Sequence, residues 1–181
     1  VVPEEQRDSI KETISSKFSN FEPIAFYETI VRAYETKLDT SSFKNFHDII
    51  QLQEAWNITR GSEKITVAVV DNGFDLSHNA FNGKIIKPYN IFTGDGKVYC
   101  DGELGKHGTH VAVTAIGKDS TNIGGVAPLC KLMPIQVFDG EFTTNYAIMN
   151  GIMHAVKNGA DVVNVSAEPI FENLSHVDVE I

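Results

Sequence analysis

Apolar residues before the first glycine of the chain recur at helical spacing. Ile10, Ile14 and Phe18 lie four residues apart and form one narrow stripe. Pro23 is suited to open a second helix, because its fixed φ matches the first helical turn. A third helix is expected over 46–56, so the pattern predicts a helical N-terminal segment without chemistry of its own. The apolar side of the second helix would comprise Ile24, Tyr27, Ile30, Val31, Tyr34 and Leu38.

From Gly61 onward, segments of strand character alternate with segments of helix character. KITVAVVD is rich in β-branched residues and ends at Asp71, before an Asn-Gly turn signal. GKIIKPYNIF, KLMPIQVF and ADVVNVS are further strand candidates, and the proline in the first favours an edge position or a break. Helices are predicted for HGTHVAVTAIG and for 143–158, which Gly159 ends. The alternation predicts an α/β fold, with a mostly parallel sheet flanked by helices.

Three polar residues are expected at one edge of this sheet. Asp71 ends the first strand, Ser166 ends the fourth, and His107 opens a helix. Ligands of open parallel sheets bind beyond the carboxyl ends of the strands. The pattern alone therefore places a candidate functional site at this edge.

Composition narrows the possible partners. The 181 residues carry a net charge of −9, which repels phosphate backbones, so we expect no nucleic-acid partner. No apolar run approaches the ~20 residues that span a bilayer, and the acidic N-terminus lacks the features of a signal peptide. We therefore expect no membrane association, while the compartment stays open and secretion is not excluded. Cys100 and Cys130 match no metal pattern and are expected to be free thiols.

Each residue of the candidate site also has an ordinary structural interpretation. An aspartate after a strand commonly caps a turn, and a single histidine is commonly a surface residue. Together they suit another role, because a buried carboxylate beside an imidazole fixes its tautomer and stabilises the imidazolium that forms on protonation. His107 would be a general base and Asp71 the residue that orients it. The glycine after His107 would keep the start of the helix open to substrate.

Metal binding is the chemical alternative for the two histidines. His107 and His110 lie three residues apart, whereas the helical metalloprotease signature has a four-residue spacing and a glutamate base between its ligands. Gly108 and Thr109 stand between the two histidines here, and no third ligand is evident. We therefore predict no metal at this site.

The segments that carry these residues are similar to those of a known family. VAVVDNGFDLSH, HGTHVAVTAIG, IGGVAP and NGADVVNVS resemble, in the same order, segments of the subtilisin-like serine peptidases. The resemblance covers about 46–166 and implies a seven-stranded parallel sheet, of which this chain would carry about four strands. It also implies peptide-bond cleavage by an Asp-His-Ser triad, with Asp71 and His107 as the first two members and His110 as a structural residue of the helix.

The third member of the triad is not evident. The Gly-Thr-Ser motif and the oxyanion asparagine of the family do not occur in these residues. Ser166 matches a pocket-lining position, Ser62 precedes the first strand, and Ser175 lies in a polar tail. The nucleophile is therefore expected on a C-terminal part of the same domain, possibly as a second chain. We divide the chain into an extension, pro-segment or linker at 1–45 and the N-terminal portion of a peptidase domain at 46–181.

The resemblance also implies a substrate-binding region and an alternative function. Ser166 and Ala167 would line the substrate pocket, and DGEFTTN, with Glu141 and Phe142, would pair with the substrate backbone as an added strand. Glu168 would select basic side chains by charge pairing, or would be a solvated loop residue. The replaced glycine at Val113 supports the alternative, an inactive subtilisin-like module that binds peptides or a protein partner.

Calcium is the only cofactor that the resemblance suggests. GKDSTNIGG resembles an ion-binding loop of the family and makes Asp119 a candidate ligand. Ala80 stands where the family has an aspartate, so the oxygen cage would be incomplete. We therefore expect no cofactor.

Overall fold

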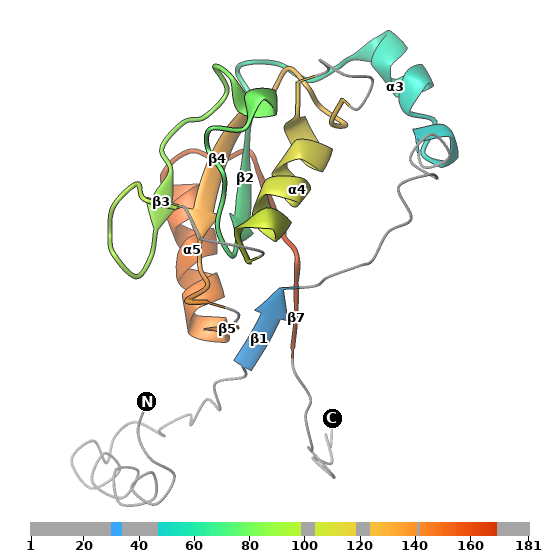
Figure 1. The fold of residues 1–181 in the computed structure, drawn as a ribbon. Coiled ribbons are helices and arrows are strands. Elements are labelled where there is room, and N and C mark those ends of the chain that lie inside the picture. The colour runs from blue at the N-terminus through green and yellow to red at the C-terminus, as the bar shows by residue number, and fades with distance from the viewer. Residues whose placement is uncertain (1–29, 34–46, 99–103, 119–123, 141, 170–181) are drawn as a thin grey trace, which may run out of the picture.

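The centre of the molecule is a four-stranded sheet. The computed structural model describes residues 30–33, 47–98, 104–118, 124–140 and 142–169. The sheet has the order β3-β4-β2-β6, and every pair of neighbours is parallel (Figure 1). The predicted parallel sheet of four strands is therefore confirmed. Its strands are β2 (Thr66–Asp71), β3 (Tyr89–Asn90), β4 (Lys131–Gln136) and β6 (Val162–Val165).

Two long helices cover the opposite faces of this sheet. Successive residues of a strand point to opposite faces, and β2 is buried along its whole length. Val69 belongs to the apolar cluster that contains Ile116 of α4, whereas Val70 belongs to the cluster that contains Ala155 of α5. The strand that ends at Asp71 is therefore enclosed on both sides, as its unbroken apolar run requires. The helices are α4 (Leu104–Ile116) and α5 (Asn145–Lys157).

A shorter helix, α3 (Leu52–Ile58), precedes the sheet. It overlaps the helix expected over 46–56 but ends later. Nε1 of Trp56 donates a hydrogen bond to the carbonyl oxygen of Val126 at 2.8 Å, and the guanidinium of Arg60 lies 4.4 Å from the centre of the Trp56 ring. These contacts tie α3 to the loop that precedes β4.

The N-terminal segment contributes a strand where a helix was predicted. β1 (Ile30–Ala33) is the middle strand of a second, antiparallel sheet with the order β5-β1-β7. The helix predicted from the apolar spacing between 23 and 38 is therefore wrong at Ile30–Ala33, and the rest of that span lies outside the described residues. The reason is tertiary, because strands on both sides of β1 satisfy its backbone groups and override a weak local preference. Its neighbours are β5 (Phe142–Thr144) and β7 (Ala167–Pro169).

The second strand candidate, GKIIKPYNIF, is interrupted as its proline suggested. Ile85 makes a single bridge to Leu132, and only Tyr89–Asn90, after Pro88, pair regularly with β4. β3 lies at the edge of the parallel sheet, where a missing N–H is tolerated. The predicted edge position and break are both confirmed.

Two expectations from composition can be compared with the structure. Cys130 is a free, buried thiol, and Cys100 lies outside the described residues. Among the helices of the described ranges, none is both long and apolar enough to cross a membrane. The division of the chain at residue 45 stays a prediction, although β1 belongs to the first part and pairs with strands of the second.

Candidate active site

The carboxyl end of β2 holds Asp71 in a fixed position. The Asp71 side chain is fully buried, and its Oδ1 accepts a hydrogen bond from the backbone N–H of Asn72 at 2.7 Å. The backbone carbonyl of Asp71 accepts a second bond from the N–H of Val137, just beyond β4, at 2.9 Å. A central strand with such anchors presents its last side chain in one orientation.

The first turns of α4 bring His107 to this carboxylate. Nδ1 of His107 lies 2.8 Å from Oδ1 of Asp71, and only 11% of the histidine side chain is exposed. The two residues thus meet at one edge of the sheet, although 36 positions separate them in the chain. The other oxygen of Asp71, Oδ2, has no hydrogen-bond partner among the described residues. The short contact through Oδ1 therefore gives the carboxylate its one side-chain partner in the described part of the chain.

The loop after β2 is also joined to α4 beside this pair. Oδ1 of Asn72 accepts a hydrogen bond from the N–H of Gly108 at 3.2 Å, and Oγ1 of Thr109 accepts one from the N–H of Asp75 at 2.8 Å. These two bonds and the Asp71–His107 contact join the end of β2 and the loop after it to three successive residues of the helix. Sequence reasoning treated Asn72 only as part of a turn signal and assigned no role to Thr109. Their presence in DNGFD and HGTH was the available signal.

Gly108 has a packing role that differs from the one expected. A Cβ added there would lie 2.3 Å from the carbonyl oxygen of Gly73 and 3.0 Å from Cβ of Asp71. The glycine is therefore needed for the close approach of α4 to the loop after β2. The sequence interpretation, in which it keeps the start of the helix open to substrate, misses this cause.

The candidate substrate-binding residues lie on β5 and around β7. Ser166 follows Val165, which pairs with Val70, so the register places Ser166 beside the end of β2. Its Oγ accepts a hydrogen bond from Nδ2 of Asn164 at 3.0 Å. Phe142 on β5 is 46% exposed, and Ala167 is the first residue of β7. Glu141 lies outside the described residues.

The strand paired with these segments belongs to the chain itself. β1 runs antiparallel between β5 and β7, with Ala33 opposite Ala167 and Arg32 opposite both Phe142 and Glu168. DGEFTTN was expected to pair with the backbone of a substrate. In this structure, the added strand is Ile30–Ala33.

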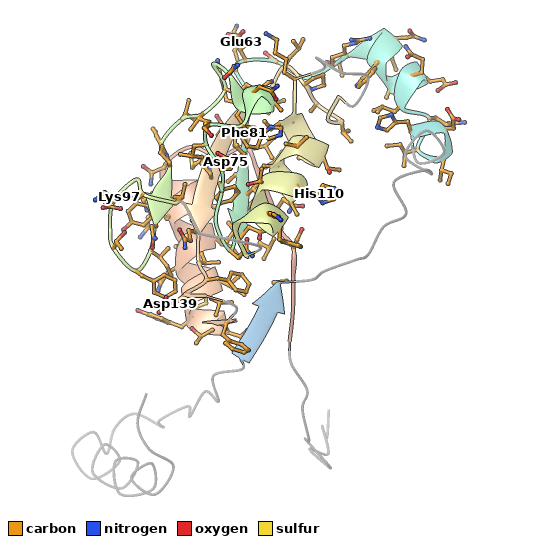
Figure 2. The ribbon with its side chains drawn as sticks, in the orientation of Figure 1. Glu63, Asp75, Phe81, Lys97, His110 and Asp139 are labelled. Atoms are coloured by element: carbon orange, nitrogen blue, oxygen red, sulfur yellow. The ribbon has the colours of Figure 1, made fainter. Side chains whose placement is uncertain are left out.

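The residues considered for metals do not assemble into a cluster. No group of three or more His, Cys, Asp or Glu side chains suited to a metal occurs in the described part of the chain. His110 is exposed on the outer side of α4 (Figure 2). Ala80 is buried in a short turn (Asn79–Phe81), and Asp119 lies outside the described residues. Among the described residues, His107 therefore has a carboxylate beside it and no set of metal ligands.

Asp75, Lys84 and His154 are among the ionisable groups with displaced pKa values. Hydrogen bonds from Ser77 lower the pKa of Asp75, in the loop after β2. Burial lowers the pKa of Lys84, whose Nζ donates to the carbonyl oxygens of Pro128 and Cys130. Burial also lowers the pKa of His154, with a smaller contribution from the charge of Lys87. Lys84 bonds to these two backbone carbonyls and the His154 ring stacks on Tyr89, so we assign both residues structural roles.

Val113, where the family usually has glycine, is accommodated within the core. Its side chain packs against the cluster on the α4 side of the sheet, and a Cβ added to Gly117 would lie 2.9 Å from its Cγ1. The Asp71–His107 contact of 2.8 Å is present with this valine in place.

The fold and the site define a class of protein, an α/β protein with a parallel sheet flanked by helices, whose carboxyl edge carries a paired aspartate and histidine. The model of the Subtilase family matches residues 62–177, and the chain belongs to this family. This finding confirms the resemblance inferred from the four sequence segments.

Individual relatives are serine proteases. A thermophilic serine proteinase from Bacillus sp. (strain AK1) is 35% identical over 115 residues, which are 62% of this chain and 28% of that protein. The major intracellular serine protease of Bacillus subtilis (strain 168) is 35% identical over 136 residues, which are 73% of this chain and 43% of that protein. The chain therefore spans less than half the length of each.

Solved structures give the same assignment. The crystal structure of fervidolysin from Fervidobacterium pennivorans, a keratinolytic enzyme related to subtilisin, has a TM-score of 0.53 and 33% identity. The match covers 64% of this chain and 18% of fervidolysin.

Proposed function

We propose that this chain carries the aspartate and histidine of a serine endopeptidase that hydrolyses peptide bonds with an Asp-His-Ser triad. The observation that carries the proposal is the 2.8 Å contact between Oδ1 of the fully buried Asp71 and Nδ1 of His107. A carboxylate at Nδ1 keeps a proton on that nitrogen, so Nε2 is the ring nitrogen that accepts a proton. His107 is then the general base, and Asp71 orients it.

The reaction uses this pair twice. Nε2 of His107 takes the proton of the serine hydroxyl while the serine oxygen attacks the carbonyl carbon of the scissile bond. The carboxylate of Asp71 stabilises the imidazolium that forms, and the imidazolium returns its proton to the leaving amine. Water then repeats the attack on the acyl-enzyme, with His107 again as the base.

The nucleophilic serine is assigned to a C-terminal part of the domain, on the same or a second chain. Ser166 sits at the end of a strand and its hydroxyl is bonded to Asn164, which suits a residue that lines a pocket. The free edge of β6 supports a further part of the domain, because β6 pairs only with β2 in the described part of the chain. Val162 and Val165 on this strand are 51% and 38% exposed, although strands of parallel sheets are usually covered.

The substrate is a polypeptide in extended conformation. β5 and β7 accept an antiparallel strand between them, and the peptide backbone provides the same hydrogen-bonding groups whatever its sequence. Ser166, Ala167, Glu141 and Phe142 are assigned to substrate binding on this basis. The alternative function, an inactive module that binds peptides or a partner protein, would use the same strand position without the chemistry.

The experiment that separates these functions uses the full-length protein and a fluorophosphonate probe, which labels an activated serine. We expect labelling of a serine outside residues 1–181 in the wild type. His107→Ala should abolish the labelling, because the serine then lacks its base. His110→Ala is the matched control, since His110 lies on the same helix and is exposed, and it should label as the wild type does.

Absence of labelling in a folded wild-type protein that still binds peptides would favour the inactive module. Equal labelling of the wild type and His107→Ala would remove the assigned role of the histidine.

A further inference from the structure

Asn72, the residue after Asp71, is a buried polar residue to which the triad chemistry assigns no role. Only 3% of Asn72 is exposed, and its Oδ1 accepts a hydrogen bond from the backbone N–H of Gly108 at 3.2 Å. Burying an amide costs free energy unless the amide is hydrogen-bonded, so this bond compensates for the burial of the side chain. The chain thus places a hydrogen-bond acceptor directly against the helix that carries His107.

The N–H that Asn72 binds belongs to the peptide bond between His107 and Gly108. Oδ1 of Asp71 lies 2.8 Å from Nδ1 of the same histidine. Two consecutive residues at the end of β2 therefore hold His107 at two points, Asp71 at the ring and Asn72 at the main chain. The N–H of Asn72 also donates to Oδ1 of Asp71 at 2.7 Å, which ties the two holding residues to each other.

Two points of attachment are needed to fix the ring nitrogen that takes the proton. A single contact at Nδ1 fixes one atom of the imidazole, and the ring still turns about that atom when the main chain of His107 shifts. Holding the next peptide bond prevents this shift, so Nε2 keeps its position. A misplacement of about 1 Å at a reacting group costs on the order of 10²-fold in rate.

The packing around this bond keeps it in place. Gly108 lies against the same turn, since a Cβ added there would come within 2.3 Å of the carbonyl oxygen of Gly73. The next residue of the helix, Thr109, accepts a hydrogen bond from the N–H of Asp75 at 2.8 Å. The loop after β2 and this part of α4 are therefore joined on both sides of the Asn72–Gly108 bond.

We infer that Asn72 is a positioning residue for His107, which acts through its hydrogen bond to the N–H of Gly108. The inference rests on the proposed peptidase function, in which His107 is the general base. An acceptor at position 72 then sets kcat, whereas the binding of substrate does not depend on it.

A matched pair of variants tests the inference in the full-length protein. Asn72→Leu keeps roughly the size of the side chain and lacks the acceptor, while Asn72→Asp keeps an acceptor oxygen. We expect Asn72→Leu to lower kcat on a peptide substrate about 10- to 100-fold and to leave KM nearly unchanged. Asn72→Asp should keep most of the wild-type kcat. Both are compared on the alkaline plateau of the pH profile, where the added charge does not alter the protonation state of the histidine.

A second acceptor variant covers the case in which Asn72→Asp does not fold, since that variant places two carboxylates side by side in a buried turn. Asn72→Ser has a neutral hydroxyl acceptor on a shorter side chain. It should recover part of the kcat that is lost in Asn72→Leu. Circular dichroism confirms that each variant compared is folded at the assay temperature.

The position of the ring is also measured without catalysis. A proton between Nδ1 and a carboxylate at this short distance gives a ¹H NMR resonance far downfield, which labelled histidine identifies. The resonance should broaden or disappear in Asn72→Leu and persist in the acceptor variant. Asn90→Leu is the control for lost stability, because Asn90 is a buried asparagine that ends β3 and bonds to Gln136 and Lys97. It should unfold more easily than the wild type and keep the resonance.

The outcomes separate the inference from the proposed function. Wild-type kcat and an unchanged resonance in Asn72→Leu would overturn the inference and leave the peptidase function intact. Equal losses of kcat in Asn72→Leu and in a folded acceptor variant would also overturn it, since the acceptor would then not be the cause. Absence of fluorophosphonate labelling in the wild type would overturn the peptidase function, and the resonance alone would then decide whether Asn72 holds the ring.

Discussion

The carbonyl oxygen of Gly73 lies so close to Gly108 that an added Cβ would come within 2.3 Å of it. This approach brings the start of α4 against the loop after β2 and places the residue before Gly108, His107, beside Asp71. The close approach of Gly108 to the backbone carbonyl of Gly73 therefore helps to set the geometry of the candidate active site.

Gly108→Ala should consequently damage both stability and activity. The added methyl group meets backbone on one side and Asp71 on the other, so α4 has to shift, at a cost of about 1–3 kcal/mol in the free energy of unfolding. Urea unfolding measures the cost, and kcat of the full-length enzyme should fall as well. His110→Ala on the exposed side of the same helix should change the free energy of unfolding by less than about 0.5 kcal/mol. Equal effects of the two variants would contradict the packing role of Gly108.

Asp71→Asn should reduce kcat of the full-length enzyme far more than KM. An amide at this position no longer holds His107 in the tautomer that leaves Nε2 as the base, which corresponds to a loss of about 10⁴-fold in kcat. Steady-state kinetics on a peptide substrate measure the effect. Asp75→Asn, in the same loop, should lose less than about tenfold in kcat, because the Asp75 carboxylate bonds to Ser77, and its bond to Thr109 comes from the backbone N–H, which the variant keeps. A Asp71→Asn enzyme with near-normal kcat would exclude the orienting role.

Stability should depend on pH through His154. Its ring stacks on Tyr89 with centroids 3.6 Å apart, and burial followed by the Lys87 charge lowers its pKa below 6.5. The unfolded chain therefore binds the proton more readily than the folded protein, and stability is lost as the pH falls from 6.5 through the folded-state pKa. Urea unfolding at pH 7.5 and pH 5 should show a smaller decrease for His154→Phe, which keeps a stacking ring without the titration. An identical pH dependence in the variant would show that other groups cause it.

Ser77→Ala should raise the pKa of Asp75 towards its ordinary value of 3.8. The Ser77 hydroxyl is the largest cause of the lowered pKa, and the Ser77 backbone N–H, which remains in the variant, also contributes. Because the pKa of Asp75 is lowered in the folded state, the stabilisation is present above pH 3.8 and is lost as the pH falls through the folded pKa. Carboxyl resonances in an NMR titration measure the shift. Ser77→Thr keeps a hydroxyl and should titrate as the wild type does.

The local sequence pattern predicted the secondary structure correctly where a residue's environment depends mainly on its own segment. The β-branched run before Asp71 is buried on both faces and forms the central strand β2. The break at Pro88 has a local cause too, because proline lacks the N–H that a regular strand uses. The segment HGTHVAVTAIG is small and apolar after its first residues and lies in α4 up to Ile116, although that helix begins at Leu104 and not at His107 as predicted. The strand and the helix together predicted that Asp71 and His107 lie at one edge of the sheet.

The local sequence pattern predicted the wrong structure, or missed a packing role, where a residue's partners belong to distant segments of the chain. Ile30–Ala33 lies within an apolar series with helical spacing, yet it forms β1 because β5 and β7 provide hydrogen-bonding partners on both sides. Those partners follow it by more than a hundred positions, so no local window contains them. The need for Gly108 has the same origin, since the atom that excludes a side chain there belongs to Gly73.

The amino-acid order of this protein was thus sufficient for its alternating strands and helices, its parallel sheet and the identity of the paired aspartate and histidine, because these depend on short-range periodicity and on the direction of successive strands. Folding in three dimensions was needed for the 2.8 Å contact itself, for the strand between β5 and β7, and for the register that sets Arg32 opposite Glu168. Such features depend on contacts between residues that are far apart in the chain, and the pattern within a single segment does not predict those contacts.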